Sequence, residues 1–290
     1  MGNGKRLRPL GTADLLDETV ELYKSNFVLI LGISALVNAP IGLLSVIQSL
    51  HMYLALLGFP LLLAMAAFTP VFTAAVIFAI SDRYFNRPTT IEACYRRAFS
   101  GSIYWNMLGI GILQGVAVAA CMMVAAAPAM VVVVVMMIGS RQPTFPSTAM
   151  AAMIAFMLVG ALATAPLWVR LMLAGPAMVV ERQGASSALG RSWTLIKGSV
   201  FRSTLVIVIA YVVVNTVPSV LGGLLAPLTG HANYYDVPVL YRVTEQGIVL
   251  LARVMLAPLL VIAETLLYFD LRVRKEGLDL QLMAGEMESR

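Results

Sequence analysis

Three ionisable residues lie inside long apolar segments of the sequence: Arg170, Arg253 and Glu264. A charge at membrane depth costs about 2.5–3.5 kcal/mol on insertion scales, so such residues usually pair with one another or mark a substrate pathway. A pair between Arg170 and Glu264 would neutralise both charges inside a helical bundle. We expect this pair either to fix the packing of the helices or to line a substrate or proton pathway. Arg253 is expected to extend to the membrane surface or to pair with Glu245, two turns earlier.

The sequence contains few of the residues and motifs that catalysis or metal binding requires. The two histidines (His51 and His231) and the two cysteines (Cys94 and Cys121) lack the spacing of a zinc site or of a Cys-x-x-Cys pair. No phosphate-binding loop, dinucleotide-binding loop, His-Glu-x-x-His or Gly-x-Ser-x-Gly motif occurs. The sequence therefore predicts a protein that is not an enzyme and that holds no metal and no cofactor.

The composition indicates which class of protein must position these residues. Of the 290 residues, 60% are apolar and 12% are charged, and the mean hydropathy is +0.87. A soluble domain has about 45–50% apolar and about 25% charged residues. These values exclude a soluble enzyme and a disordered chain, and they indicate a polytopic membrane protein. The net charge of +5 lies beside the apolar segments, so it predicts membrane orientation and no nucleic-acid partner.

Six apolar segments are long enough to cross a membrane, which takes about 20 residues of helix. They cover residues 27–50, 56–80, 104–138, 147–180, 201–228 and 248–269. Most lysines and arginines lie before the first segment, between the second and third, between the fourth and fifth, or after the sixth. The loops on the other side have only Arg141 and Arg242. Because loops rich in basic residues stay in the cytoplasm, both termini are predicted to be cytoplasmic.

A short amphipathic segment precedes the first, third and fifth of these spans. The three segments cover residues 12–27, 89–99 and 184–199. Thr12 is the expected N-cap of the first segment, and Thr89 with Glu92 has the spacing of a capping box. We therefore predict an all-α, single membrane domain over residues 1–290, with three units of an amphipathic helix followed by a transmembrane hairpin. The units cover residues 10–87, 88–182 and 183–280.

A proline recurs at a similar place in each span. The six prolines are Pro40, Pro70, Pro128, Pro166, Pro218 and Pro258. Proline frees a backbone carbonyl, which neighbouring helices and water can satisfy within a membrane. We expect helix kinks at these positions, either as ordinary bends or as the means of opening a central cavity.

Three stretches of sequence carry a resemblance to a known family. They are VERQG at 180–184, ALGRSWTLIKG at 188–198 and LYFDLRVRKEGLDL at 267–280, and RPLGT at 8–12 with LYKSNF at 22–27 adds to them. The chain resembles the membrane domain associated with some glycerophosphoryl diester phosphodiesterases, which also occurs alone as a six-helix integral membrane protein. The resemblance covers both ends of the chain and is weak through the middle.

The resemblance implies a prokaryotic cytoplasmic (inner) membrane protein, and it does not imply an enzyme. In that family the phosphodiesterase activity belongs to a separate soluble barrel domain that supplies histidine, glutamate and metal-binding acids. No part of this sequence matches such a domain, so the family name gives the location of the chain and leaves its activity open.

Two functions fit this architecture. The first is a membrane scaffold or accessory subunit that acts on membrane lipids or on a partner protein, which includes a second copy of the chain. The second is a small permease or channel-like transporter with a cavity lined by Arg170 and Glu264. A polar cavity near these residues favours transport, whereas a solid apolar bundle favours the scaffold. The amphipathic helices either lie on the lipid surface or pack beneath the bundle.

Overall fold

The structure, a computed structural model, describes residues 10–50, 52–139, 147–223 and 237–277. These parts of the chain are helices joined by turns, without a strand among them, and the all-helical prediction is confirmed for them. The helices are α1 (Thr12–Ser25), α2 (Phe27–Gln48), the 3₁₀ helix η1 (Met52–Leu57), α3 (Gly58–Tyr84), α4 (Ile91–Ala98), α5 (Gly101–Gly139), α6 (Ser147–Met172), α7 (Ala174–Glu181), α8 (Ala185–Ile196), α9 (Val200–Gly223) and α10 (Val239–Glu276).

Five of these helices are long and apolar enough to cross a membrane, namely α2, α3, α5, α9 and α10. In α5 the qualifying stretch is Gly101–Val124, and it buries only 11% of its span, against 22–33% in the other four helices. Most of this stretch therefore lies outside the protein core and is available to lipid or to a partner. The fourth predicted span falls on α6, where many side chains lie outside the described residues. The protein is thus membrane-embedded, and a sixth span stays a prediction.

The fourth predicted segment, 147–180, is interrupted in the structure, whereas the sequence predicted one continuous span. α6 ends at Met172, and a separate helix, α7, begins at Ala174. Pro176 is the third residue of α7, where a missing backbone N–H removes no intrahelical hydrogen bond. Proline therefore fits the first turn of a new helix better than the interior of a continuous one. Residues 174–179 are all buried, so α7 belongs to the interior of the bundle.

The sixth predicted segment, 248–269, is shorter than the helix that contains it. α10 begins at Val239 and continues to Glu276. Its first two turns contain Arg242, Thr244 and Glu245. Because these residues are polar, the apolar segment in the sequence begins only after them.

The prolines lie within helices that continue past them. Those described inside helices are Pro40 in α2, Pro70 in α3, Pro166 in α6, Pro218 in α9 and Pro258 in α10. Pro128 falls within α5, but its side chain lies outside the described residues. The kinks expected at these positions stay a prediction.

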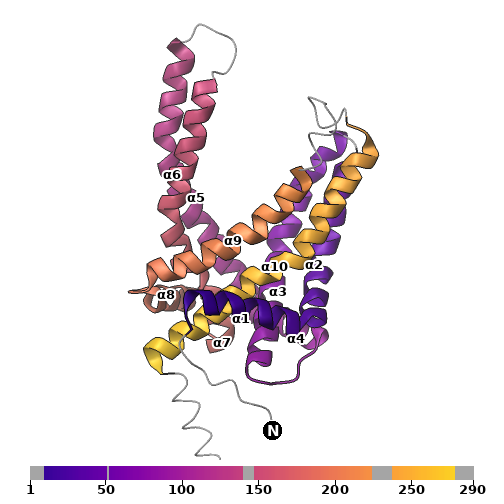
Figure 1. Ribbon diagram of the computed structural model, residues 1–290, viewed down its shortest axis with the longest axis vertical. Helices are drawn as coiled ribbons and strands as arrows, with labels where there is room; N and C mark the ends of the chain where they lie inside the picture. Colours follow the sequence, from indigo (N-terminus) through magenta and orange to yellow (C-terminus); the bar gives the residue numbers. More distant parts are fainter. Residues whose placement is uncertain (1–9, 51, 140–146, 224–236, 278–290) are drawn as a thin grey trace, which may run out of the picture.

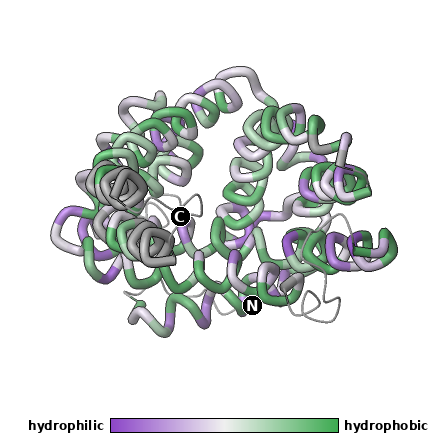
Figure 2. Tube along the Cα trace, turned by 90° about the horizontal axis from the view of Figure 1, so that it is seen from above, coloured by the Kyte–Doolittle hydropathy of each residue, from purple (hydrophilic) through white to green (hydrophobic). Residues whose placement is uncertain are grey.

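The long helices rise from a base of short ones (Figure 1). We call this base the basal end; it is made of α1, α4, α7, α8, the C-terminal end of α10 and the adjoining ends of α3, α5, α6 and α9. From it α5 and α6 rise as one arm, and α2, α3 and α10 form a second arm that diverges from the first. α9 runs obliquely between them, in contact with both α6 and α10. Seen from above, apolar residues predominate along the long helices (Figure 2).

Two short helices begin one residue away from the predicted caps. The N-cap of α1 is Gly11, whose backbone N–H donates to the carboxylate of Asp14 at 3.0 Å. The N-cap of α4 is Thr90, whose hydroxyl accepts from the N–H of Ala93 at 3.2 Å. Thr12 and Thr89 are therefore not the caps, because Thr12 is the first helical residue and Thr89 interacts with side chains further along α4.

The core of the molecule surrounds the C-terminal half of α10. Residues 261–271 are buried on every side, as expected of a helix packed on all its faces. The ring of Phe269 is fully buried and stacks on that of Tyr84 with 5.0 Å between centroids. α10 contacts α1, α2, α3, α7, α8 and α9, so it is the central helix of the basal end.

Three of the short helices, α1, α4 and α8, pack chiefly against helices other than the one that they precede. α4 packs chiefly against α3, although it precedes α5. α8 packs chiefly against α7 and α6, although it precedes α9. α1 precedes α2, yet it packs chiefly against α10 and α9 at the other end of the chain. These contacts join helices from the beginning, the middle and the end of the described chain.

Candidate functional site

The residues singled out from the sequence lie apart. The guanidinium of Arg170 stacks over the ring of Trp193 in α8, with 4.6 Å from its central carbon to the ring centroid. The backbone carbonyl of Arg170 accepts a hydrogen bond of 2.6 Å from the hydroxyl of Ser192. Both contacts join α6 to α8, and a cation–π contact of this kind contributes about 0.5–2 kcal/mol. Arg170 therefore has a packing role at the basal end.

Glu264 and Arg253 have no charged partner among the described residues. Glu264 is buried in α10, with 6% of its surface exposed, and within the described chain no ion pair joins it to Arg170. Arg253 is exposed on α10, and the described residues include no ion pair between it and Glu245. The structure thus places the three predicted residues at three separate positions.

Three acidic residues at the basal end, besides Glu276, form ion pairs that hold the short helices. The first is Asp82, near the end of α3, whose carboxylate accepts hydrogen bonds from the guanidinium of Arg97 in α4. The same guanidinium donates to the hydroxyl of Thr89 at 3.3 Å and lies 4.5 Å from the centroid of the Phe78 ring. The hydrogen bond to Asp82 raises the pKa of Arg97 above its ordinary value, so this arginine is always charged.

The second acid is Glu181, the last residue of α7. It accepts from Arg191 of α8 at 3.0 Å and from the hydroxyl of Tyr268 of α10 at 2.7 Å. Arg191 also contacts Glu276 at 2.6 Å, close to the end of α10. The hydrogen bonds to Glu276 and then to Glu181 raise the pKa of Arg191. One arginine thus connects α7, α8 and α10.

The third acid is Asp270 in α10, whose side chain is completely buried. Its carboxylate accepts from the backbone N–H of Leu10 at 2.8 Å and from Arg202 of α9 at 2.7 Å. Arg202 also donates to the carbonyl of Leu10 at 2.7 Å. Arg274, one turn further along α10, donates to the same carboxylate at 3.0 Å. Asp270 therefore fixes the start of α1 against α9 and α10.

The sequence indicated two of these acids without their partners. Asp82 and Asp270 each follow the proline of their span by 12 residues, a regularity that predicted their position at one end of the bundle. Glu181 lies just beyond the fourth predicted span, and no pattern in the sequence distinguished it from other charged residues. Asp82 ties α3 to α4, Glu181 ties α7 to α8 and α10, and Asp270 ties α10 to α9 and to the chain just before α1.

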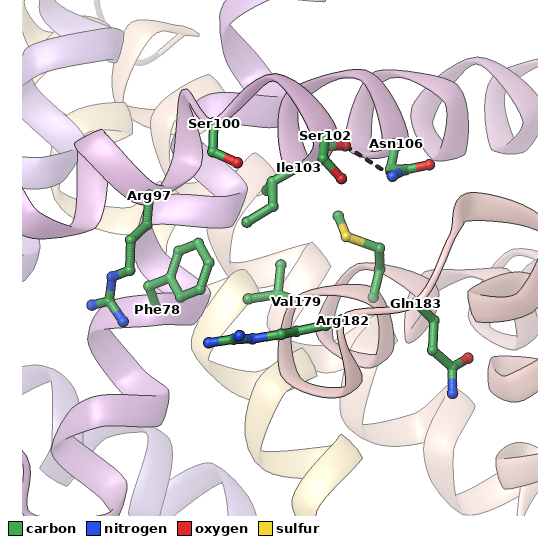
Figure 3. Close-up of a pocket in the computed structure, with 10 residues that line it drawn as sticks. Phe78, Arg97, Ser100, Ser102, Ile103, Asn106, Val179, Arg182 and Gln183 are labelled. Atoms are coloured by element: carbon green, nitrogen blue, oxygen red, sulfur yellow. Dashed lines mark hydrogen bonds between the residues drawn. The ribbon is translucent and has the colours of Figure 1, made fainter.

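A pocket of about 340 Å³ opens at the basal end between the α4–α5 turn and the end of α7 (Figure 3). Its polar lining comes from Arg97, Ser100, Ser102, Asn106, Arg182 and Gln183. Phe78, Ile103, Met178 and Val179 line the rest. In the sequence the two arginines are part of the charge asymmetry that predicts membrane orientation, and no motif indicates that they share a pocket.

Two of the polar residues in the pocket are already bonded within the protein. Asn106 accepts from the N–H of Ala185 at 3.2 Å and donates to the carbonyl of Ser102 at 2.8 Å. Gln183 donates to Glu181 at 2.7 Å. Both therefore shape the pocket, and the free donors must come from its other members.

A second pocket, of about 280 Å³, lies on another face of the same turn. It is lined by Ala67, Phe68, Phe99, Gly101, Tyr104 and Trp105, which are apolar or aromatic. Phe99 is 56% exposed and Trp105 is 67% exposed. Aromatic side chains exposed in this way are typical of the boundary between lipid chains and headgroups.

At the opposite end of the bundle, Arg242 is a structural residue. It was expected in a loop, but it lies in the first turn of α10 and is only 4% exposed. Its guanidinium donates to the carbonyl of Ser49 at 2.7 Å, just beyond the end of α2. A cation at a helix C-terminus satisfies carbonyls that have no partner in the helix. Arg242 thus joins α2 to α10.

Metal-binding and redox chemistry have little support in the part of the chain that the structure describes. No group of three or more histidine, cysteine, aspartate and glutamate residues is found there. Cys94 is buried in α4 with its sulfur 3.4 Å from the hydroxyl of Thr89, and Cys121 lies in α5. Burial raises the pKa of the Cys94 thiol, which makes it a poor nucleophile.

Comparison with known proteins gives one match. No curated protein matches the chain, and no solved structure matches it. Residues 144–283, just under half of the chain, contain α6 to α10 and the acids Glu181 and Asp270. Over these residues the chain matches the family described as the membrane domain of glycerophosphoryl diester phosphodiesterase, which confirms the resemblance predicted from the sequence.

Proposed function

We propose that this protein is a non-catalytic scaffold of a prokaryotic cytoplasmic membrane that gathers anionic phospholipids at its basal end. One observation carries the proposal: exposed aromatic side chains and basic residues share that end. Trp193 is 42% exposed and Phe201 is 84% exposed, close in sequence to Arg191, Lys197 and Arg202. Aromatic anchors beside cations are typical of surfaces that contact anionic headgroups.

The proposal takes the architecture as six spans in three units, over residues 10–87, 88–182 and 183–280. The exchange of short helices among the hairpins supports it, because α1, α4 and α8 each pack against the hairpin of the preceding unit in a cyclic order. The acids Asp82, Glu181 and Asp270 support it as well, since each lies toward the C-terminal end of one unit and bonds to the segment that leads into another.

The proposed orientation places the basal end and both termini in the cytoplasm. Besides Arg170, the described cations of the basal end are Lys24, Arg83, Arg87, Arg96, Arg97, Arg182, Arg191, Lys197, Arg202, Arg272, Arg274 and Lys275. Such an excess on one side favours cytoplasmic placement. Reporter fusions at the two termini would test this. Both should give the signal of a cytoplasmic reporter, and an external signal from either terminus would refute the orientation.

A permease is the alternative, and it would use Arg170 and Glu264. Neither residue lines either of the two pockets described above, and Arg170 is engaged with Trp193. The exposed surface of α5 also favours lipid contact over an enclosed channel. These observations rank the scaffold above the permease.

The family description names a phosphodiesterase, and we propose that this chain has no such activity of its own. It would instead hold lipid near an enzyme or another partner, which includes a second copy of the chain. Purified protein incubated with glycerophosphocholine should release no glycerol 3-phosphate above background. Release that depends on the protein would overturn this part of the proposal.

Energy transfer in proteoliposomes would separate the scaffold from the permease. Tryptophan fluorescence should transfer more efficiently to dansyl-labelled phosphatidylglycerol than to dansyl-labelled phosphatidylcholine, because Trp105 and Trp193 lie exposed at the basal end. Vesicles loaded with a pH-sensitive dye should show no proton flux that depends on the protein. A flux that disappears in Glu264→Gln would favour the permease, and equal transfer to both lipids would refute the scaffold.

A further inference from the structure

The pocket between the α4–α5 turn and α7 has an uncompensated positive charge. Arg97 shares its charge with Asp82. Arg182, in the part of the chain that the structure describes, makes no hydrogen bond and no ion pair. Figure 3 shows its side chain extended along the pocket toward Phe78 and Arg97. One guanidinium thus faces the pocket with all its donors free.

The backbone of Arg182 adds a second indication that its side chain matters. It follows α7 with φ of 53°, a left-handed conformation in which glycine is the usual residue after a helix. A side chain there costs about 1 kcal/mol or more. An arginine at this position aims the guanidinium across the pocket, whereas a residue within α7 would point along the helix surface.

The donors that remain free match a phosphate group. Guanidinium groups bind phosphate through pairs of parallel N–H donors. The hydroxyls of Ser100 and Ser102 line the same pocket and, among the described contacts, neither is engaged in a hydrogen bond. The volume of about 340 Å³ lies in the range of small-molecule sites. The chemistry selects an oxyanion with several acceptor oxygens.

The position of the pocket points to a lipid as the source of that phosphate. Phe99 and Trp105 are exposed on another face of the same turn, around the apolar second pocket. The α4–α5 connection therefore has a cationic polar face and, close to it in sequence, an aromatic apolar face. This is the arrangement expected at headgroup depth, where a phosphate and the start of an acyl chain lie close together.

We propose that Arg182, Ser100 and Ser102, beside the paired Arg97, form a discrete site for the phosphate of one anionic phospholipid headgroup. The site rests on the proposed function, because it assigns to one pocket a part of the lipid binding attributed to the basal end. It extends that function by predicting a defined stoichiometry and geometry in place of general attraction to a charged surface.

Native mass spectrometry of the full chain, released from detergent with added lipid, tests the site. Wild-type protein should bind one dioleoylphosphatidylglycerol more tightly than any further copy, and more tightly than dioleoylphosphatidylcholine. Arg182→Gln should weaken that first binding about tenfold, as expected for loss of a charged, bidentate donor. Arg96→Gln is the matched control, since Arg96 is an exposed arginine of α4 outside the pocket, and should change binding by less than about twofold.

The variant Arg182→Gly distinguishes loss of lipid binding from loss of folding. Glycine adopts φ of 53° without strain, so this variant should unfold at the same temperature as wild type or higher, while its lipid binding falls as in Arg182→Gln. A variant that loses stability and lipid together would overturn the assignment of Arg182 as a ligand-binding residue.

Inorganic phosphate and glycerol 3-phosphate form a separate arm that distinguishes a soluble ligand from a lipid. Under the proposal neither displaces the first lipid. Displacement by either compound, lost in Arg182→Gln, would assign the pocket to a soluble phosphate and overturn the lipid. Equal weakening by Arg182→Gln and Arg96→Gln would overturn the discrete site and leave the scaffold standing. Absence of any preference for phosphatidylglycerol in the wild type would refute both.

Discussion

The backbone N–H of Leu10 donates a hydrogen bond of 2.8 Å to the carboxylate of Asp270, 260 positions away in the sequence. Because Arg202 and Arg274 bind the same carboxylate, one buried acid joins the start of α1 to α9 and α10. The short helix at the beginning of the chain is therefore held by the last long helix.

Asp270→Asn should lower the free energy of unfolding by about 2–3 kcal/mol. Removal of one partner from a buried ion pair costs about 3–5 kcal/mol, and this cost is reduced because the side chains of Arg202 and Arg274 are 23% and 36% exposed. Unfolding by SDS in mixed micelles would measure it. Asp17→Asn makes the same chemical change on the exposed face of α1 and should have little effect; equal losses in both variants would contradict the role of Asp270.

Tyr268 and Glu181 should be energetically coupled. The hydroxyl of Tyr268 donates to Glu181 at 2.7 Å, in a network with Arg191 and Arg272. Tyr268→Phe should cost about 1 kcal/mol for the lost hydrogen bond. In a double-mutant cycle with Glu181→Gln, the stability lost in the double variant should be smaller than the sum of the two single losses. The difference should be about 0.5 kcal/mol or more. Strict additivity would show that the hydrogen bond contributes nothing to stability.

A side chain at position Gly222 should lower the stability of the protein. A Cβ built there would lie 2.8 Å from a methyl carbon of Val249 in α10, and valine has little rotamer freedom with which to move away. Gly222→Ala should therefore destabilise the protein by about 1–2 kcal/mol through overpacking. Gly115→Ala is the control, because a Cβ at Gly115 meets nothing within 4 Å. Its thermal unfolding midpoint should stay the same or rise, whereas a fall as large as that of Gly222→Ala would refute the close contact.

Cys94 should react slowly with maleimide in the Cys121→Ser background. Burial raises its pKa, so the reactive thiolate is scarcer than in the unfolded chain, and labelling should speed up sharply on unfolding. The same shift has a consequence for stability. The thiol favours folding fully below the unfolded pKa of about 8.5, and this contribution is lost as the pH rises through the higher pKa of the folded state. Rapid labelling of the folded protein would contradict the burial.

The helices could be predicted from the sequence far better than their contacts. Apolar runs located α2, α3, α5 and α9 closely, because a span is defined by composition along the chain. The break before Ala174 was missed, since apolar residues continue across it and only Pro176 marks it. The first turns of α10 were missed for the opposite reason, as Arg242 made a buried helical turn look like a loop.

The pair expected between Arg170 and Glu264 shows where sequence reasoning fails. Spacing along a helix gives the depth of a residue, but which neighbour it faces depends on how the helices are rotated and tilted. Arg170 faces Trp193 of α8, a helix that no spacing argument places beside it. The same limit applies to the pocket, because Arg97 and Arg182 lie 85 positions apart in the sequence and are brought together by packing alone.

The exchange of short helices also dictates an order of assembly during synthesis. α4 and α8 can dock as soon as they are made, because α3 and then α6 and α7 precede them on the ribosome. Among the described helices α1 emerges first and α10 last, so α1 must wait for α10. At about 5–20 residues per second, the 260 positions between Leu10 and Asp270 correspond to a delay of roughly 13–50 s. Throughout that time the apolar face of α1, with Leu15 and Leu22, needs a temporary partner, and the nearby bilayer surface can provide one.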